Sequence, residues 1–208
     1  MKVNVYNIFL KEGNKAAEKI ARLAVKNNNV LNQVLKGALS ESKRVKNAAA
    51  KCLREISRIQ PEKLYPSFDL FVKLIGGKDT ILMWNAIEVL SNLTEVDKDN
   101  KFNGKILNKY IFLLSEDSMV TAANTISALG KVALNKPGFR KRITGELVKV
   151  NSLPHSVECR NILAGKALDT FENYIDDIKY KNEIIQFAEK QMKNRRNATR
   201  KKAGKLLK

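Results

Sequence analysis

One apolar pattern recurs along this chain of 208 residues, and it constrains the fold more than any other feature. A small residue is followed four and seven residues later by larger apolar residues, as in Ala122, Ile126 and Leu129. These spacings place the three side chains on one face of an α-helix. The pattern starts at Ala16, Ala49, Ala86, Ala122, Ala164 and Ala203, the last copy keeping only Leu207. Starting positions 33 to 42 residues apart are typical of a helical repeat array.

The repeated small residue has a physical role in such an array. Alanine at the start of an inner helix lets a neighbouring helix approach closely, and the larger residues fill the space beyond it. Apolar segments between the copies predict one outer helix for each inner helix. We therefore expect an all-α fold, an α-solenoid of about six two-helix repeats in a single domain, with approximate bounds 1–27, 28–60, 61–96, 101–135, 137–173 and 176–208.

Polar turns separate the predicted helices. Ser40-Glu41-Ser42 precedes the segment with the best helix propensity, KRVKNAAAKCLREISRI, and a serine there can cap that helix. Asp79 or Thr80 can cap the next inner helix. Pro61 suits the first turn of the outer helix between them.

The two-helix period, the small-then-apolar inner pattern and the turns LLSEDS (113–118) and LIGGKDT (74–80) carry a family resemblance. In these features the chain resembles HEAT and armadillo-type repeat proteins, and HEAT-like is the closer description. The resemblance implies a right-handed superhelix whose inner helices line a concave groove. It also implies a binding scaffold and leaves the ligand open.

The charge of the chain narrows the choice of partner. It carries 39 basic and 21 acidic residues, a net charge of +18 and a pI of about 9.9. Such a balance favours nucleic acid, an anionic membrane surface or an acidic protein segment, and a lysine-rich composition that serves solubility is the alternative. No apolar run reaches the ~20 residues of a membrane span. Cys52 and Cys159 are expected as small core residues, in a reduced, cytoplasmic setting.

Residues opposite the buried face of each inner helix are the predicted partner-binding residues. In the second repeat they are Asn47, Lys51, Arg54 and Arg58. In the third they include Trp84, Glu88 and Ser91. In the last three they include Asn124, Lys131, Lys166, Lys201 and Lys205. The groove is therefore expected to be basic at both ends and mixed in the middle.

Two basic clusters lie outside this set. One is Arg140-Lys141-Arg142. The other belongs to the run from Lys190 to Lys208, which contains no acid and includes Arg195, Arg196 and Arg200. A run of this kind fits a solvated terminal helix, a contact with nucleic acid or a contact with an anionic membrane.

Catalytic motifs are nearly absent from the sequence. His155 is the only histidine and is expected as a polar turn residue, so histidine-based triads and histidine-rich metal sites are excluded. Trp84 and Glu88 lie one helical turn apart and resemble a fragment of the site of alkylation-repeat DNA glycosylases. A second Trp and a matching Arg are missing, and packing against the adjacent helix is the alternative role for Trp84.

The sequence thus predicts a noncatalytic scaffold without a cofactor or metal. Its expected partner is an extended acidic protein segment, bound in the basic groove. Nucleic acid, bound with little sequence specificity, is the alternative. A glycosylase-like enzyme that uses Trp84 and Glu88 is the third hypothesis.

Overall fold

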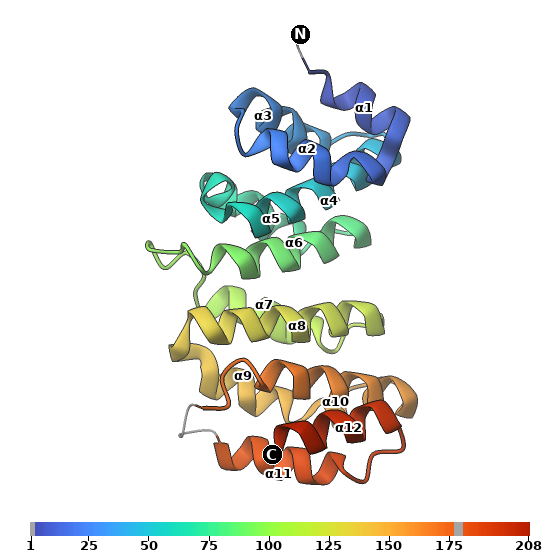
Figure 1. The fold of residues 1–208 in the computed structure, drawn as a ribbon, viewed down its shortest axis with the longest axis vertical. Coiled ribbons are helices and arrows are strands. Elements are labelled where there is room, and N and C mark those ends of the chain that lie inside the picture. Colours follow the sequence, from blue (N-terminus) through green and yellow to red (C-terminus); the bar gives the residue numbers. More distant parts are fainter. Residues whose placement is uncertain (1–2, 177–180) are drawn as a thin grey trace. The chain divides into compact units, whose positions relative to one another are not determined.

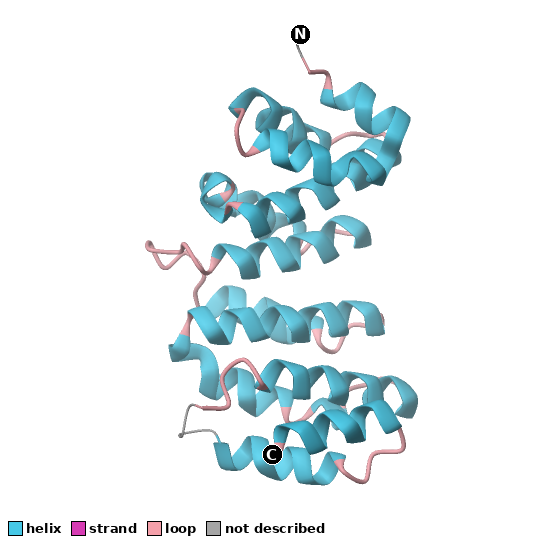
Figure 2. Cartoon of the chain, in the orientation of Figure 1, coloured by secondary structure: helices cyan, strands magenta, loops and turns pink. Residues whose placement is uncertain are grey.

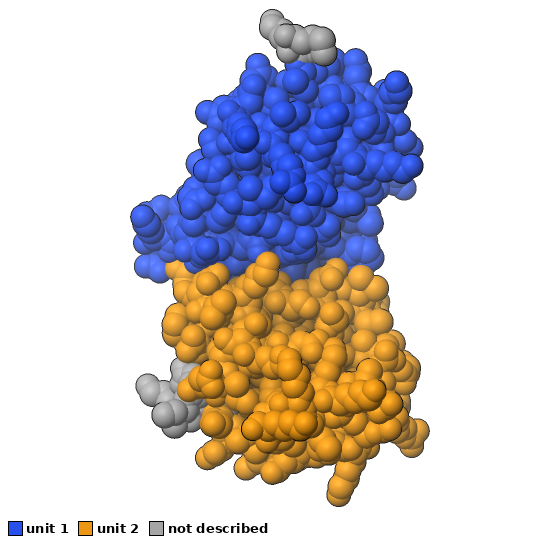
Figure 3. Space-filling model, viewed as in Figure 1, with its two compact units in different colours: residues 1–103 blue, residues 104–208 orange. Residues whose placement is uncertain are grey.

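The described part of the chain is built from helices alone (Figures 1 and 2). The computed structural model describes residues 3–176 and 181–208, and no strand occurs within those ranges. The chain divides into two compact units, residues 1–103 and 104–208 (Figure 3). In each unit, helices adjacent in the sequence pack as pairs, which confirms the expected all-α class.

Unit 1 holds the first six α-helices. They are α1 (Val5–Glu12), α2 (Ala17–Ala24), α3 (Asn28–Gly37), α4 (Lys43–Ile59), α5 (Phe68–Leu74) and α6 (Thr80–Leu93). The even-numbered helices form one layer, because α4 packs against both α2 and α6. In the second layer, α3 packs on α2 and α4, and α5 packs on α6.

Unit 2 repeats this arrangement. Its helices are α7 (Gly104–Leu113), α8 (Met119–Asn135), α9 (Arg140–Leu147), α10 (Val157–Phe171), α11 (Lys181–Gln191) and α12 (Asn197–Leu206). Here α8, α10 and α12 form one layer, because α10 packs against both α8 and α12. Helices α7, α9 and α11 pack against this layer.

Side-chain caps explain where the longer helices begin. Asp79 Oδ1 accepts a hydrogen bond from Leu82 N (3.1 Å), and Ser42 Oγ accepts one from Val45 N (3.5 Å). Both caps are as predicted. Ser118 and Ser156 cap α8 and α10 in the same way. A cap of this kind is worth about 1 kcal/mol, because it satisfies an amide that the helix leaves without a partner.

The outer helix expected to begin at Pro61 differs from the prediction. Pro61 opens a short 3₁₀ turn, Pro66 lies in a second one, and α5 begins only at Phe68. Proline fixes φ and lacks an N–H, so two prolines five residues apart cannot both lie inside one regular helix.

The predicted inner-face residues form the core, with two exceptions. Ala49, Leu53 and Ile56 are at most 2% exposed, and the corresponding residues of α6, α8 and α10 are buried as well. Leu23 and Leu207, however, are 39% and 37% exposed. Helix α2 instead buries Ala17, Ile20, Ala21 and Ala24, so its buried face is rotated relative to the expected one.

Polar contacts between successive inner helices also join residues about one repeat apart. Asn92 Nδ2 donates to Ser57 Oγ (2.8 Å), which links α6 to α4. Thr170 Oγ1 donates to Ile126 O (3.0 Å), and Thr199 Oγ1 donates to Asn161 O (2.8 Å). These buried or half-buried hydrogen bonds determine the register of each inner helix relative to its neighbour.

Candidate binding surfaces

The predicted face of α4 and α6 is a mixed charge cluster. Arg58 Nε lies 2.7 Å from Glu88 Oε1, and Arg54 Nη2 lies 3.1 Å from Glu55 Oε1. Arg54 Nε is also 3.8 Å from Glu88 Oε2, and Arg58 Nη1 is 3.4 Å from Glu55 Oε2. Two arginines and two glutamates therefore neutralise one another, and this surface offers little net charge to a partner.

The other predicted residues of unit 1 lie beside this cluster on the same two helices. Asn47, Lys51 and Trp84 are half-buried, and Lys51 has no ion pair within the described residues. Ser91, predicted on the same face as Trp84, is fully buried and donates to Glu88 O (2.8 Å). Ser91 is therefore excluded from any binding surface.

In unit 2 the predicted residues of α10 and α12 lie among ion pairs. Lys205 Nζ lies 2.8 Å from Glu172 Oε2, which raises the pKa of Lys205. The neighbouring Lys202 pairs with Asp169, so α12 is bridged to α10 and to Glu172, the residue that follows it. Lys201 is exposed, whereas Lys166 on α10, and Asn124 and Lys131 on α8, are half-buried.

The first basic cluster divides between structural and exposed residues. Arg140 Nε donates to Ala133 O (2.8 Å), and its guanidinium lies 5.9 Å from the centre of the Tyr174 ring. Burial raises the pKa of Tyr174 to about 12, although its hydrogen bond with Thr144 and the charge of Arg140 act in the opposite direction. Arg140 therefore holds the start of α9 in place, while Lys141 and Arg142 are exposed.

The second basic cluster divides in the same way. Arg200 Nη1 donates to Asn194 O (2.7 Å) and Arg195 O (3.0 Å), so it closes the turn between α11 and α12. Arg196 Nη1 lies 3.0 Å from Glu158 Oε1 of α10. Arg195 is exposed and forms no ion pair in the part of the chain that the structure describes.

A basic surface on α2 was not predicted from the sequence. Its basic members recur at steps of four, three and four residues: Lys15 lies in the 3₁₀ turn Gly13–Ala16 before α2, Lys19 and Arg22 lie on α2, and Lys26 follows its end. All are exposed. They surround a shallow hollow of about 530 Å³, to which Glu18 and the exposed Leu23 also contribute. We call these six residues the α2 basic surface.

Charges on the α2 basic surface are only partly neutralised. Glu18 pairs with Arg22, with Oε1 and Nη2 2.9 Å apart and both side chains about 70% exposed. Within the described ranges, Lys15, Lys19 and Lys26 have no acidic partner. Three free ammonium groups and an apolar side chain thus share one exposed face. The helical spacing of the basic residues was the available signal.

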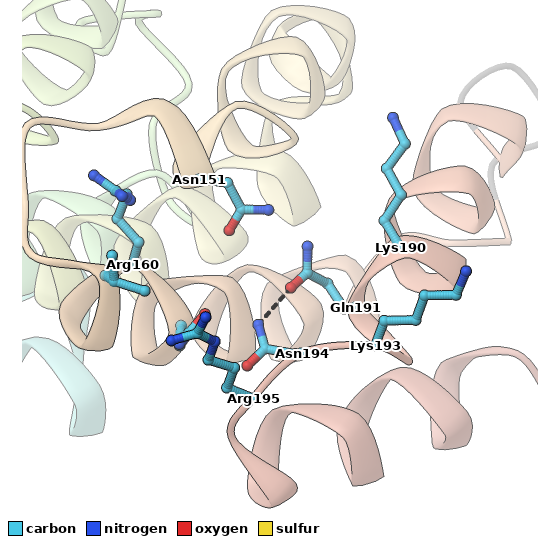
Figure 4. Close-up of a pocket in the computed structure, with 9 residues that line it drawn as sticks. Asn151, Arg160, Lys190, Gln191, Lys193, Asn194 and Arg195 are labelled. Atoms are coloured by element: carbon cyan, nitrogen blue, oxygen red, sulfur yellow. Dashed lines mark hydrogen bonds between the residues drawn. The ribbon is translucent and has the colours of Figure 1, made fainter.

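A pocket in unit 2 is the second feature that the sequence did not predict. It has a volume of about 320 Å³ and lies where the start of α10 meets the end of α11 (Figure 4). Its lining is polar and basic except for Val157, and consists of Asn151, Val157, Arg160, Asn161, Lys190, Gln191, Lys193, Asn194 and Arg195. The lysines belong to the basic run seen in the sequence, but Arg160 and Gln191 join them only through folding.

The two cysteines and the single histidine are the remaining reactive side chains, and all three are at least partly buried. Cys52 is fully buried, as expected, and burial raises the pKa of its thiol, whereas Cys159 is only half-buried. His155 lies in the turn before α10, as expected, and it is buried there with its Nε2 3.2 Å from Leu114 O. Among residues 3–176 and 181–208, no cluster of side chains could hold a metal ion, and no helix is long and apolar enough to cross a bilayer.

Comparisons with known proteins bear on the fold. No protein-family model matches the chain, and no curated protein matches it. Two crystal structures of engineered proteins, from the Northeast Structural Genomics Consortium, are similar to it. One aligns with a TM-score of 0.59 at 17% identity and covers 93% of this chain and 88% of its own. The other gives 0.62 at 16% identity and covers 93% and 90%. At such identities the likeness is one of fold alone.

Proposed function

We propose that this chain is a noncatalytic, HEAT-like helical-repeat scaffold that binds an extended acidic protein segment. The repeat architecture, a right-handed solenoid of about six helix pairs, is supported by the apolar pattern at steps of 33 to 42 residues. The pairing of sequence-adjacent helices and the hydrogen bonds between successive inner helices within each unit support it too.

The α2 basic surface carries the proposal about the partner. Lys15, Lys19 and Lys26 lack acidic partners within the described ranges, so their charges are available to an anionic ligand. Leu23 lies among them at 39% exposure. An acidic segment that also carries apolar side chains complements both features, because carboxylates meet the ammonium groups and an apolar side chain covers Leu23.

The same surface favours protein over nucleic acid. A phosphate backbone would use the lysines but gain nothing from Leu23. The α2 basic surface itself carries no aromatic side chain on which a base could stack, and stacking is a main source of affinity for single strands. Acidic protein is therefore the partner class that uses the whole surface.

Binding of labelled ligands measured by fluorescence anisotropy tests this proposal. The ligands are a short Glu- and Leu-containing peptide, the same peptide with Leu replaced by Ser, and a single-stranded RNA and a double-stranded DNA. We expect the Glu/Leu peptide to bind most tightly at physiological salt and to lose affinity when Leu is replaced. Tighter binding of either nucleic acid, with no difference between the two peptides, would replace the acidic-protein proposal with the nucleic-acid alternative.

A further inference from the structure

The pocket of unit 2 has the charge of an anion site. Four of its lining residues are cationic, none is acidic, and the cations are Arg160, Lys190, Lys193 and Arg195. The first turn of α10 contributes Val157, and the N-terminal end of a helix carries a partial positive charge. The acid in that turn, Glu158, does not line the pocket and is paired with Arg196.

A buried amide in the pocket points to a ligand. Asn194 Oδ1 accepts a hydrogen bond from Arg196 N (2.9 Å), so its Nδ2 is the donor toward Gln191. This Nδ2 lies 2.7 Å from Gln191 Oε1, which leaves Gln191 Nε2 as the outward-facing atom of the amide. Gln191 as a whole residue is 3% exposed, and among the described residues its side chain uses only Oε1 in a hydrogen bond, which leaves Nε2 facing the space of the pocket. In Figure 4 this nitrogen is turned toward Asn151, into the pocket.

The arrangement separates contact residues from long-range charges. Figure 4 shows Arg160, Asn151 and Arg195 on one side of the Gln191–Asn194 pair. Arg160 Nη1 already donates to His155 O (2.7 Å), which fixes that guanidinium while leaving its other N–H groups. Lys190 and Lys193 stand at the rim with their ammonium groups directed outward, so they add attraction without forming the floor.

We propose that this pocket binds the phosphate group of a phosphate monoester. A tetrahedral dianion accepts hydrogen bonds from several directions, and guanidinium forks and a fixed amide N–H supply such donors here. A volume of about 320 Å³ leaves room for a small organic group beside the phosphate. The site belongs to unit 2 and shares no residue with the α2 basic surface, so each of the two proposals can be tested and rejected independently of the other.

Isothermal titration of the full chain tests the site with inorganic phosphate and phosphoserine, at constant ionic strength with chloride as the reference. We expect saturable binding of phosphoserine. Arg195→Gln, at an exposed position, should weaken it at least tenfold, and Gln191→Glu should abolish it by placing a carboxylate on the floor. The control, Lys141→Gln with Arg142→Gln, removes two exposed cations of α9 and should leave binding unchanged.

Several results would overturn the proposal. One is the absence of saturable phosphoserine binding, and another is an Arg195→Gln variant that binds phosphoserine as tightly as the parent does. A third is a control variant that loses as much affinity as Arg195→Gln does, because that would indicate attraction by net charge alone. Arg195→Gln decides the matter even if the buried charge of Gln191→Glu prevents folding. Tighter binding of phosphoserine than of inorganic phosphate identifies a monoester site, whereas the reverse order contradicts the monoester and assigns the pocket to free phosphate.

Discussion

Arg58 on α4 and Glu88 on α6 are ion-paired across the two helices, with Arg58 Nε 2.7 Å from Glu88 Oε1. The residues are 30 positions apart in the sequence, about one repeat. Burial lowers the pKa of Arg58, but the hydrogen bond and charge of Glu88, with the charge of Glu55, more than offset it and raise the pKa. The pair therefore joins successive inner helices and removes two charges from the surface where the sequence predicted a basic groove.

Breaking this pair should cost little stability. The Arg58 and Glu88 side chains are 46% and 27% exposed, and pairs as accessible as this contribute about 0.2–1 kcal/mol. We expect Arg58→Gln, Glu88→Gln and the double variant to unfold in urea within about 1 kcal/mol of the parent, with a small coupling energy. If Glu88→Gln lowered the free energy of unfolding by more than about 2 kcal/mol, the cluster would behave as a buried ion pair, in which removing the carboxylate leaves Arg54 and Arg58 without compensation.

The cap at Asp79 predicts a dependence of stability on pH. Burial raises the pKa of Asp79, but hydrogen bonds from Leu82 N and Lys46 Nζ outweigh it, so the pKa lies below its ordinary value of 3.8. A carboxylate with a depressed pKa stabilises the fold above its unfolded pKa and loses that contribution as the pH falls through the folded one.

The variant Asp79→Asn isolates this charge, because asparagine still caps a helix. The parent should be more stable than the variant at neutral pH, and the difference in unfolding free energy should shrink as the pH falls below about 4. Urea unfolding at a series of pH values measures it. A difference that stays constant down to acid pH would show that the carboxylate charge at this position contributes nothing.

The approach of α10 to α12 depends on Gly165. A Cβ atom at this position would lie 2.9 Å from Thr199 Oγ1, which is held by its hydrogen bond to Asn161 O. Gly165→Ala should therefore destabilise unit 2 by about 1–3 kcal/mol, despite the higher helix propensity of alanine.

Gly145 in α9 is the matched control, because a Cβ there would meet nothing within 4 Å. Gly145→Ala should stabilise the protein by about 0.5–1 kcal/mol through helix propensity alone. Thermal unfolding of both variants makes the comparison. Similar shifts for the two substitutions would contradict the close packing at Gly165.

The two cysteines should react differently with iodoacetamide. Cys52 is fully buried, and burial raises the pKa of its thiol, so little thiolate is present or accessible in the folded state. Cys159 is half-buried near the start of α10. Mass spectrometry of the native protein should find Cys159 modified first, and Cys52 only after denaturation. Early modification of Cys52 would mean that α4 opens locally.

Much of the fold was predictable because it depends on short-range patterns. The spacing of Ala49, Leu53 and Ile56 defines a buried helix face, and the position of Ser42 before it defines where that helix begins. The rotated face of α2 was not predictable. Ala16 and Ala17 are both buried, so either could be the first residue of the repeated pattern. A pattern that starts at Ala16 puts Leu23 on the buried face, whereas one that starts at Ala17 puts Ala21 and Ala24 there.

The candidate sites were harder to predict, since charge pairing depends on neighbours one repeat away. The sequence placed Arg54 and Arg58 on one face of α4, but it could not show that Glu88 of the next inner helix would neutralise them. Likewise, the pocket combines Arg160 with Gln191, which belong to different helices. Only the α2 basic surface could have been predicted from spacing, because its basic residues recur at helical steps within one short stretch of the sequence.

The most direct test of the acidic-partner proposal is the affinity of the Glu/Leu peptide for the Lys15→Gln, Lys19→Gln, Lys26→Gln triple variant. If each lysine contributes about 0.5 kcal/mol, the Kd should rise about tenfold at physiological salt. The control variant replaces three cations of unit 2, Lys141, Arg142 and Lys149, with glutamine and should keep the parental Kd. An unchanged Kd in the α2 variant, or an equal rise in both variants, would contradict the account by showing that net charge and not this surface attracts the peptide.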